Sequence, residues 1–115
     1  MNRILLVDDD HLLGEAIVEI LKIHGYSTLW VASAEEALET CLIFKPNLII
    51  SDVNLPNMGG EELKKRLSEM RETKDVPFVF LTGDVDVKQR LKGQVDVLIK
   101  PFFINDLVAK ITKYL

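Results

Sequence analysis

The sequence predicts an α/β domain built on a doubly wound, five-stranded parallel sheet. Two observations carry this prediction. Five short apolar runs recur along the 115 residues, and a stretch with helical spacing separates each run from the next. Most of the runs are almost continuously hydrophobic, as strands become when helices cover both faces of a parallel sheet. Strand and helix therefore alternate through one domain, which implies right-handed crossovers.

The strand candidates are runs of Ile, Leu, Val and Phe at residues 4–7, 28–31, 48–50, 78–81 and 95–99. The run 28–31 is the least uniformly apolar, so we expect it at an edge of the sheet. Within this run, the ordinary interpretation of Trp30 is an edge-strand aromatic ring that packs on a neighbouring side chain.

The first helix candidate has an apolar stripe formed by Leu13, Ile17 and Leu21. Asp10 is placed to cap its start, and Gly25 is placed to end it. We therefore expect the helix to lie between these two residues.

The second helix candidate opens with a capping box formed by Ser33 and Glu36. Leu38 and Cys41 continue its apolar face, and Pro46 stops it. On this face Cys41 is expected to be a small core residue rather than a metal or redox group.

Two further helices are marked by apolar spacing, and a third stretch is ambiguous. Leu63, Leu67 and Met70 mark a helix after the turn at 57–60, while Leu107, Ile111 and Leu115 mark the last helix. Between them, Asp84 to Gly93 combines helical spacing with a short alternating pattern. We expect a short or irregular fourth helix there.

The size and charge of the chain narrow the function classes. A net charge of −4 without a basic stripe argues against direct nucleic-acid binding. The apolar runs reach only about five residues, far below the ~20 needed to span a bilayer. Cys41 has no internal disulfide partner and the N-terminus has no signal-peptide pattern, so we expect a cytoplasmic protein with no membrane partner.

Polar side chains follow four of the five predicted strands, and each stands directly after an apolar run. They are Asp8, Asp9 and Asp10 after the first strand, Asp52 after the third, Thr82 after the fourth and Lys100 after the fifth. Each has an ordinary explanation when it is taken singly, such as a helix cap or a solvated lysine. Because the carboxyl ends of the strands in a doubly wound sheet collect functional groups, we predict that together they form one site.

The chemistry of these residues suits phosphoryl transfer. Asp8, Asp9 and Asp52 would crowd like charges unless a cation intervenes, and hard oxygen ligands suit Mg²⁺. Phosphoryl transfer needs a nucleophile together with positive charge and donors around the phosphoryl oxygens. Asp52 can attack, while Mg²⁺, the Lys100 ammonium and the Thr82 hydroxyl can hold those oxygens.

Four stretches together resemble the receiver, or phosphoacceptor, domains of two-component response regulators. They are Val7-Asp8-Asp9, Ser51-Asp52 with Leu55-Pro56-Asn57-Met58-Gly59-Gly60 behind it, Leu81-Thr82-Gly83 and Lys100-Pro101-Phe102. The resemblance covers nearly the whole chain. It implies one receiver domain over residues 1–115, with the flavodoxin-like strand order 2-1-3-4-5.

The resemblance also implies residue roles. Asp52 would be the phosphoacceptor, Thr82 and Lys100 would bind the phosphoryl group, and the Lys100–Pro101 bond would be cis. The residues implied in Mg²⁺ binding are all oxygen donors: Asp8 through water, and Asp9, Asp52 and the Asn54 backbone carbonyl directly.

A phosphorelay role in signal transduction follows from the same resemblance. The donor would be a phosphohistidine on a sensor histidine kinase or on a histidine phosphotransfer protein. Receivers catalyse their own phosphorylation and slow dephosphorylation, so whether the chain counts as an enzyme is partly a matter of definition. A stand-alone regulator, a relay intermediate and a part of a longer chain all fit the sequence, in any oligomeric state.

Two other function classes compete with this interpretation. The pattern Asp8-x-Asp10, followed later by threonine and lysine, also resembles the Mg-dependent phosphohydrolases of the haloacid-dehalogenase family. That family needs a late acidic pair, for which only Asp84 and Asp86 are available, and a cap domain does not fit in the chain. A flavin or dinucleotide module would bind phosphate through glycine-rich amides, whereas here three aspartates follow the first strand.

The chain departs from the receiver pattern in one region. Receivers commonly carry a tyrosine or phenylalanine three residues before the lysine, and this chain has Val97 there. The stretch from Thr82 to Lys100 is also about one helical turn shorter than is usual. We therefore expect a switch carried by Thr82, the loop 83–86 and the segment 87–93, without an aromatic lever.

Overall fold

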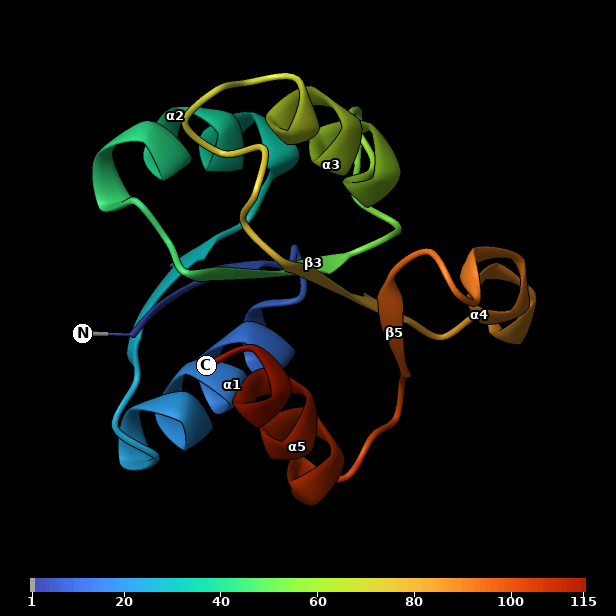
Figure 1. Cartoon of the computed structure of the whole chain (residues 1–115). Coiled ribbons are helices and arrows are strands. Elements are labelled where there is room, and N and C mark those ends of the chain that lie inside the picture. The colour runs from blue at the N-terminus through green and yellow to red at the C-terminus, as the bar shows by residue number, and fades with distance from the viewer. Residues whose placement is uncertain (1) are drawn as a thin grey trace.

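A parallel sheet of five strands forms the centre of the molecule (Figure 1). The computed structural model describes residues 2–115. Its strands are β1 (Arg3–Val7), β2 (Ser27–Val31), β3 (Leu48–Asp52), β4 (Phe78–Thr82) and β5 (Asp96–Ile99). They run parallel in the order β2-β1-β3-β4-β5, which confirms the predicted order and the edge position of the run 28–31.

Helices cover both faces of this sheet. One face carries α1 (His11–Ile23) and α5 (Ile104–Tyr114), and the other carries α2 (Ala34–Phe44) and α3 (Gly60–Ser68), as Figure 1 shows. The remaining helix, α4 (Val85–Leu91), lies beside β5 at the edge of the molecule. Among residues 2–115, no helix is both long and apolar enough to cross a bilayer.

The strands are continuously apolar because alternate residues enter two separate cores. In β1, Leu5 and Val7 pack on the side of α2 and α3, whereas Ile4 and Leu6 pack on the side of α1 and α5. All of these side chains are completely buried. Cys41 lies in the first core, as predicted, and burial raises the pKa of its thiol to about 11. The thiol therefore stays protonated at neutral pH.

Side chains cap the first two helices as the sequence predicts. The Asp10 carboxylate accepts a hydrogen bond from the Leu13 amide (3.1 Å) at the start of α1. The Ser33 hydroxyl accepts one from the Glu36 amide (3.1 Å) at the start of α2. Gly25 follows α1 with a φ of 87°, a left-handed value that glycine adopts readily.

The third helix is shorter than the predicted stripe. α3 ends at Ser68, so the prediction that Met70 belongs to this helix is wrong. The Leu67 carbonyl at the helix end accepts hydrogen bonds from the Met70 amide (3.2 Å) and from the buried Thr73 hydroxyl (2.6 Å). Met70 still packs against the core, but it does so from the turn that follows the helix.

The fourth helix is short, as predicted. It has seven residues, of which only Leu91 is buried. The Asp84 carboxylate caps its start by accepting a hydrogen bond from the Asp86 amide (2.9 Å). Gly93, with a φ of 83°, then turns the chain back toward β5.

An ionic cluster joins α5 to β5. The Asp96 carboxylate, at the start of β5, accepts hydrogen bonds from the Lys110 ammonium (3.1 Å), the Lys113 ammonium (2.9 Å) and the Tyr114 hydroxyl. The bond from Tyr114, followed by those from the two lysines, holds the pKa of Asp96 well below its usual range despite partial burial. The C-terminal helix is thereby attached to an edge strand by polar contacts as well as by its apolar face.

Candidate functional site

The two central strands bring two aspartates together at their carboxyl ends. Val7 of β1 lies in register with Ser51 of β3, so Asp8 and Asp52 emerge side by side. Asp8 is 0% exposed and Asp52 is 7% exposed. Asp9 is exposed, and one carboxylate oxygen from each of these three aspartates lies within 4.8 Å of the others. The structure thus gathers the predicted acidic residues into one cluster.

Backbone amides orient both buried carboxylates. The Asp10 amide donates to Asp8 Oδ1 at 2.9 Å, and the Asn54 amide donates to Asp52 Oδ1 at 3.1 Å. Behind Asp52, a Cβ atom at Gly60 would collide with the Asp52 backbone carbonyl. The glycine that opens α3 therefore allows this helix to pack directly against the end of β3.

Lys100 reaches the acidic cluster from the last strand. Its Nζ atom lies 2.9 Å from Asp52 Oδ2 and 3.2 Å from Asp8 Oδ2. The Lys100 backbone amide donates to the Thr82 carbonyl (2.8 Å), which continues the pairing of β5 with β4. The Lys100–Pro101 bond is cis, as expected. Lys100 therefore extends across β4 to meet carboxylates from two other strands.

Burial and charge act on these groups in opposite directions. Burial raises the pKa of Asp8, and the nearby Asp52 charge adds to this effect, although hydrogen bonds from Asp10 and Lys100 reduce it. Burial alone would lower the pKa of Lys100, but its contacts with Asp52 and Asp8 outweigh burial and raise it. Lys100 therefore remains a cation, and its ammonium pairs with two of the three carboxylates, those of Asp8 and Asp52.

The donor set of the cluster fits a hard divalent cation. All of its donors are oxygens, and one ammonium does not balance their charge. A small cation with a preference for oxygen ligands and bound water, such as Mg²⁺, relieves this repulsion without removing any side chain.

The side chains of Thr82 and Asn54 make no hydrogen bond to the acidic cluster in the part of the chain that the structure describes. Thr82 is buried at the end of β4, and its hydroxyl accepts a hydrogen bond from the Asp84 amide (3.1 Å). Within residues 2–115, this hydroxyl makes no hydrogen bond to Asp52 or Lys100. Asn54 touches the cluster through its amide, so the ligand role of its carbonyl stays a prediction.

One residue at the site was not anticipated from the sequence. The Trp30 indole N–H donates to the Asp8 backbone carbonyl at 2.8 Å. The ring also packs against neighbours, as expected for an edge-strand aromatic, with the His11 ring edge-on at 5.1 Å. The contact with Asp8 depends on the register of β2 against β1, which no local pattern reveals.

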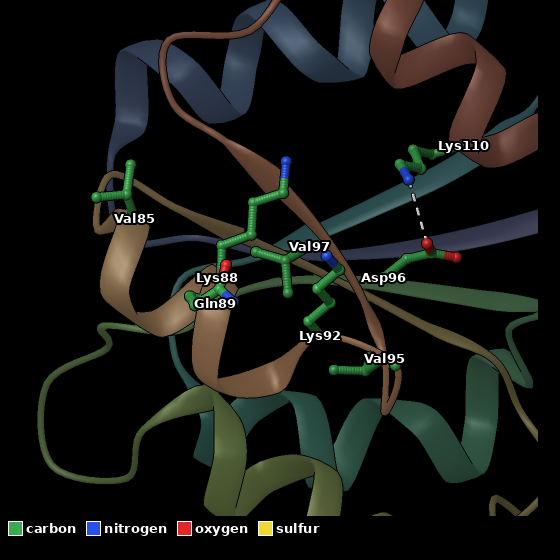
Figure 2. Close-up of a pocket in the computed structure, with 9 residues that line it drawn as sticks. Val85, Lys88, Gln89, Lys92, Val95, Asp96, Val97 and Lys110 are labelled. Carbon is green, nitrogen blue, oxygen red and sulfur yellow. Dashed lines mark hydrogen bonds and ion pairs between the residues drawn. The ribbon is translucent and has the colours of Figure 1, made fainter.

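A separate hollow of about 370 Å³ lies between α4 and β5. Figure 2 shows the side chains that line it: Val85, Lys88, Gln89 and Lys92 from α4 and its end, Val95, Asp96 and Val97 from β5 and its start, and Lys110 from α5. Val97 stands at the position where an aromatic residue is common in receivers. Val97 is buried in the core and lines this hollow, whose lining includes none of Asp8, Asp9 and Asp52.

The fold and the site together define a class of protein. It is a doubly wound α/β domain with a carboxylate cluster and a lysine at the carboxyl ends of its strands, an arrangement suited to metal-dependent phosphoryl chemistry. The sequence matches the response regulator receiver domain family over residues 4–112. The chain belongs to this family, whose role is phosphorelay signal transduction. The match gives the phosphohydrolase alternative no support.

Three relatives illustrate the likeness. Sporulation initiation phosphotransferase F of Bacillus subtilis is 30% identical over 116 residues, which cover 99% of this chain and 94% of that protein. A putative response regulator from Chloroflexus aurantiacus has a TM-score of 0.90 at 35% identity, over 98% of this chain and 96% of that one. The receiver domain of a sensor histidine kinase from Pseudomonas aeruginosa, with a magnesium ion coordinated in its active site cleft, has a TM-score of 0.88 at 25% identity, over 98% and 96%. The chain spans about half the length of several curated transcriptional regulators that it matches.

Proposed function

We propose that residues 1–115 form one receiver domain that accepts a phosphoryl group on Asp52 in a Mg²⁺-dependent reaction. The observation that carries this proposal is the position of the Asp52 carboxylate, which lies at the end of a central strand, 2.9 Å from the Lys100 ammonium and beside two further carboxylates. A nucleophile, a fixed cation and a set of oxygen ligands for a metal thus occur together.

The reaction itself asks little of the protein beyond positioning. A carboxylate oxygen of Asp52 attacks the phosphorus of a phosphohistidine, and the P–N bond breaks as the new P–O bond forms. The imidazole leaves with a proton from solvent. Lys100, whose pKa is raised, stays charged and can pair with a phosphoryl oxygen when its bond to Asp52 is given up.

Asp8, Asp9 and Asp52, together with the Asn54 carbonyl, would hold the Mg²⁺ ion. When bound, the ion shields the negative charge of both the carboxylate and the incoming phosphoryl group. The magnesium-bound receiver domain from Pseudomonas aeruginosa supports this assignment by likeness. The donor set supports it on chemical grounds.

We propose that Thr82 transmits the event. Its hydroxyl accepts the Asp84 amide bond at 3.1 Å, so engagement of the hydroxyl with a phosphoryl oxygen would compete with this contact. The loop 83–86 would then be free to move, and α4 would follow it because Asp84 also caps that helix. The end of β4 would in this way be coupled to the crossover that contains α4.

The expected donors are a sensor histidine kinase or a histidine phosphotransfer protein. We expect no direct contact with nucleic acid by this domain, because its net charge is −4. We also expect the exchange to take place in the cytoplasm, where the single buried thiol of Cys41 meets no oxidising conditions.

Intact-mass measurement after incubation with acetyl phosphate tests the proposal. The chain should gain one phosphoryl group with Mg²⁺ and none with a chelator. Asp52→Asn should abolish the gain, whereas Asp75→Asn should not, because Asp75 is an exposed carboxylate that precedes β4 at the opposite end of the sheet. If Asp8→Asn alone stops labelling while Asp52→Asn leaves it unchanged, the nucleophile is Asp8 and the proposal is wrong.

A further inference from the structure

We propose that Trp30 is a positioning residue for the acidic site: its indole N–H holds the backbone carbonyl of Asp8 and so fixes the turn that presents Asp8 and Asp9. The proposal rests on the proposed function, since it concerns the same metal and phosphoryl site. Trp30 lies on β2, an edge strand that places no carboxylate in the acidic cluster.

Both backbone groups of Asp8 are tied to β2. The Asp8 amide donates to the Val31 carbonyl at 3.1 Å, and the Asp8 carbonyl accepts the Trp30 indole N–H at 2.8 Å. Asp8 is the first residue after β1, where regular pairing of the sheet ends. The amide contact continues that pairing, whereas the carbonyl accepts its hydrogen bond from a side chain. Trp30 supplies that side chain.

The first turns of α1 are shaped to admit the indole ring. Gly14, a buried residue of α1, faces the ring so closely that a Cβ atom there would lie 2.6 Å from Cε2 and 2.8 Å from Nε1. The His11 ring meets the indole edge-on at an interplanar angle of 84°. Glycine is disfavoured inside a helix, so its presence at this position needs a packing reason. The close approach of Trp30 is that reason.

The indole suits this position because it donates a hydrogen bond without carrying a charge. Asp8, Asp9 and Asp52 hold like charges close together, and their repulsion tends to open the turn that contains Asp8 and Asp9. An arginine or lysine at this position could oppose the repulsion, but its charge would compete with a divalent cation. A neutral donor on the backbone carbonyl restrains the turn and leaves the carboxylates available for the metal.

The variant Trp30→Phe removes the donor and keeps an aromatic ring. We expect its Mg²⁺ dissociation constant, measured by calorimetry, to rise about three- to tenfold, the size associated with loss of one neutral hydrogen bond. Phosphorylation by acetyl phosphate should slow at low Mg²⁺ and recover when Mg²⁺ is saturating. Gly14→Ala, which keeps every polar group but displaces the ring, should weaken Mg²⁺ binding in the same direction.

Thr28→Val is the matched control. Thr28 lies two residues earlier on the same strand, and its buried hydroxyl has no hydrogen-bond partner within residues 2–115. This variant should bind Mg²⁺ as the unmodified chain does. If Trp30→Phe lowers the free energy of unfolding but leaves the Mg²⁺ dissociation constant unchanged, the indole only packs and the proposal is wrong.

The unmodified chain offers a test that needs no variant, because it contains a single tryptophan. Its indole N–H resonance should exchange slowly with solvent and should shift with the same midpoint as the calorimetric Mg²⁺ titration. A rapidly exchanging resonance that Mg²⁺ does not move would overturn the proposal even if Trp30→Phe fails to fold. Failure of Asp52 to become phosphorylated would count against the proposed function alone, since Mg²⁺ affinity is measured separately.

Discussion

Two regions of this domain are packed very differently. One is formed by the carboxyl ends of β1 and β3, and the other is the crossover through α4. Every residue of β3 is buried, and the backbone of Asp8 is bonded to β2 at both its amide and its carbonyl. In α4 only Leu91 is buried, and the side-chain hydrogen bonds that join this helix to another one run from Arg90 to the exposed Glu61.

This difference indicates a division of labour. The reacting groups are held by strand pairing and buried contacts, which open only with large parts of the fold. The α4 segment is held by few buried side chains and an exposed ion pair, and such pairs contribute little to stability. Under the proposed function, the groups that would meet the phosphoryl group lie in the tightly packed region, and the element that would report it lies in the sparsely packed one.

Two glycine substitutions should separate the two regions most clearly. Gly60→Ala places a Cβ atom against the Asp52 backbone carbonyl, and we expect it to lower the free energy of unfolding by about 2–3 kcal/mol. A Cβ atom at Gly83, in the loop before α4, meets nothing within 4 Å. Gly83→Ala should therefore change the free energy of unfolding by no more than about 0.5 kcal/mol. Urea unfolding measures both. Equal losses would contradict the contrast in packing.

Removing one negative charge from the tightly packed region should stabilise it when metal is absent. Asp8 is completely buried in a cluster of three carboxylates, so Asp8→Asn should raise the free energy of unfolding by about 1–2 kcal/mol in a chelator. Added Mg²⁺ should stabilise the unmodified chain more than the variant. A loss of stability in chelator would mean that the bond between Lys100 and Asp8 outweighs the repulsion.

The cluster at Asp96 should make the attachment of α5 depend on pH. Because hydrogen bonds lower its pKa in the folded state, Asp96 contributes stability above its unfolded pKa of 3.8, and this contribution fades as the pH falls below that value. Asp96→Asn should cost about 1–2 kcal/mol at neutral pH and much less near about pH 2. Asp75→Asn is the control in urea titrations at both pH values. A constant deficit for Asp96→Asn would show that the carboxylate charge is not what stabilises α5.

The smallest expected effect is the response of the α4 crossover, residues 83–93, to a phosphoryl mimic. Beryllofluoride with Mg²⁺ should change amide hydrogen exchange chiefly across residues 83–93. Val97→Ala should leave that response largely intact, since the side chain at this position is not an aromatic lever. Protection confined to Asp8, Asp9 and Asp52, or a response abolished by Val97→Ala, would contradict this account of the switch.

Much of the fold and the site could be predicted because the signals are local. Burial on both faces makes each central strand continuously apolar, and the polar residue after each strand then marks the functional end of the sheet. Met70 could not be excluded from α3, because the hydrogen bonds at the end of this helix include one from Thr73 to Leu67, which lies across a turn. A stripe of apolar residues does not reveal such a contact.

The long-range contacts of the site were beyond local patterns. Trp30 and Asp8 meet only because β2 pairs with β1 in a particular register. The Thr82 hydroxyl accepts a hydrogen bond from the backbone amide of Asp84 in the next loop, and no pattern in the sequence reveals this contact. Patterns identified the strand ends, but the geometry of the sheet decides which neighbours hold them.

The ion pair between Lys100 and Asp8 joins residues 92 positions apart, and this separation has a consequence for synthesis on the ribosome. Translation completes the acidic residues early and the lysine late. Until β5 has emerged and paired with β4, the carboxylates of Asp8 and Asp52 lack the Lys100 ammonium that contacts both of them in the folded domain. The order of the strands thereby makes the last strand the one that completes the charge balance of the cluster.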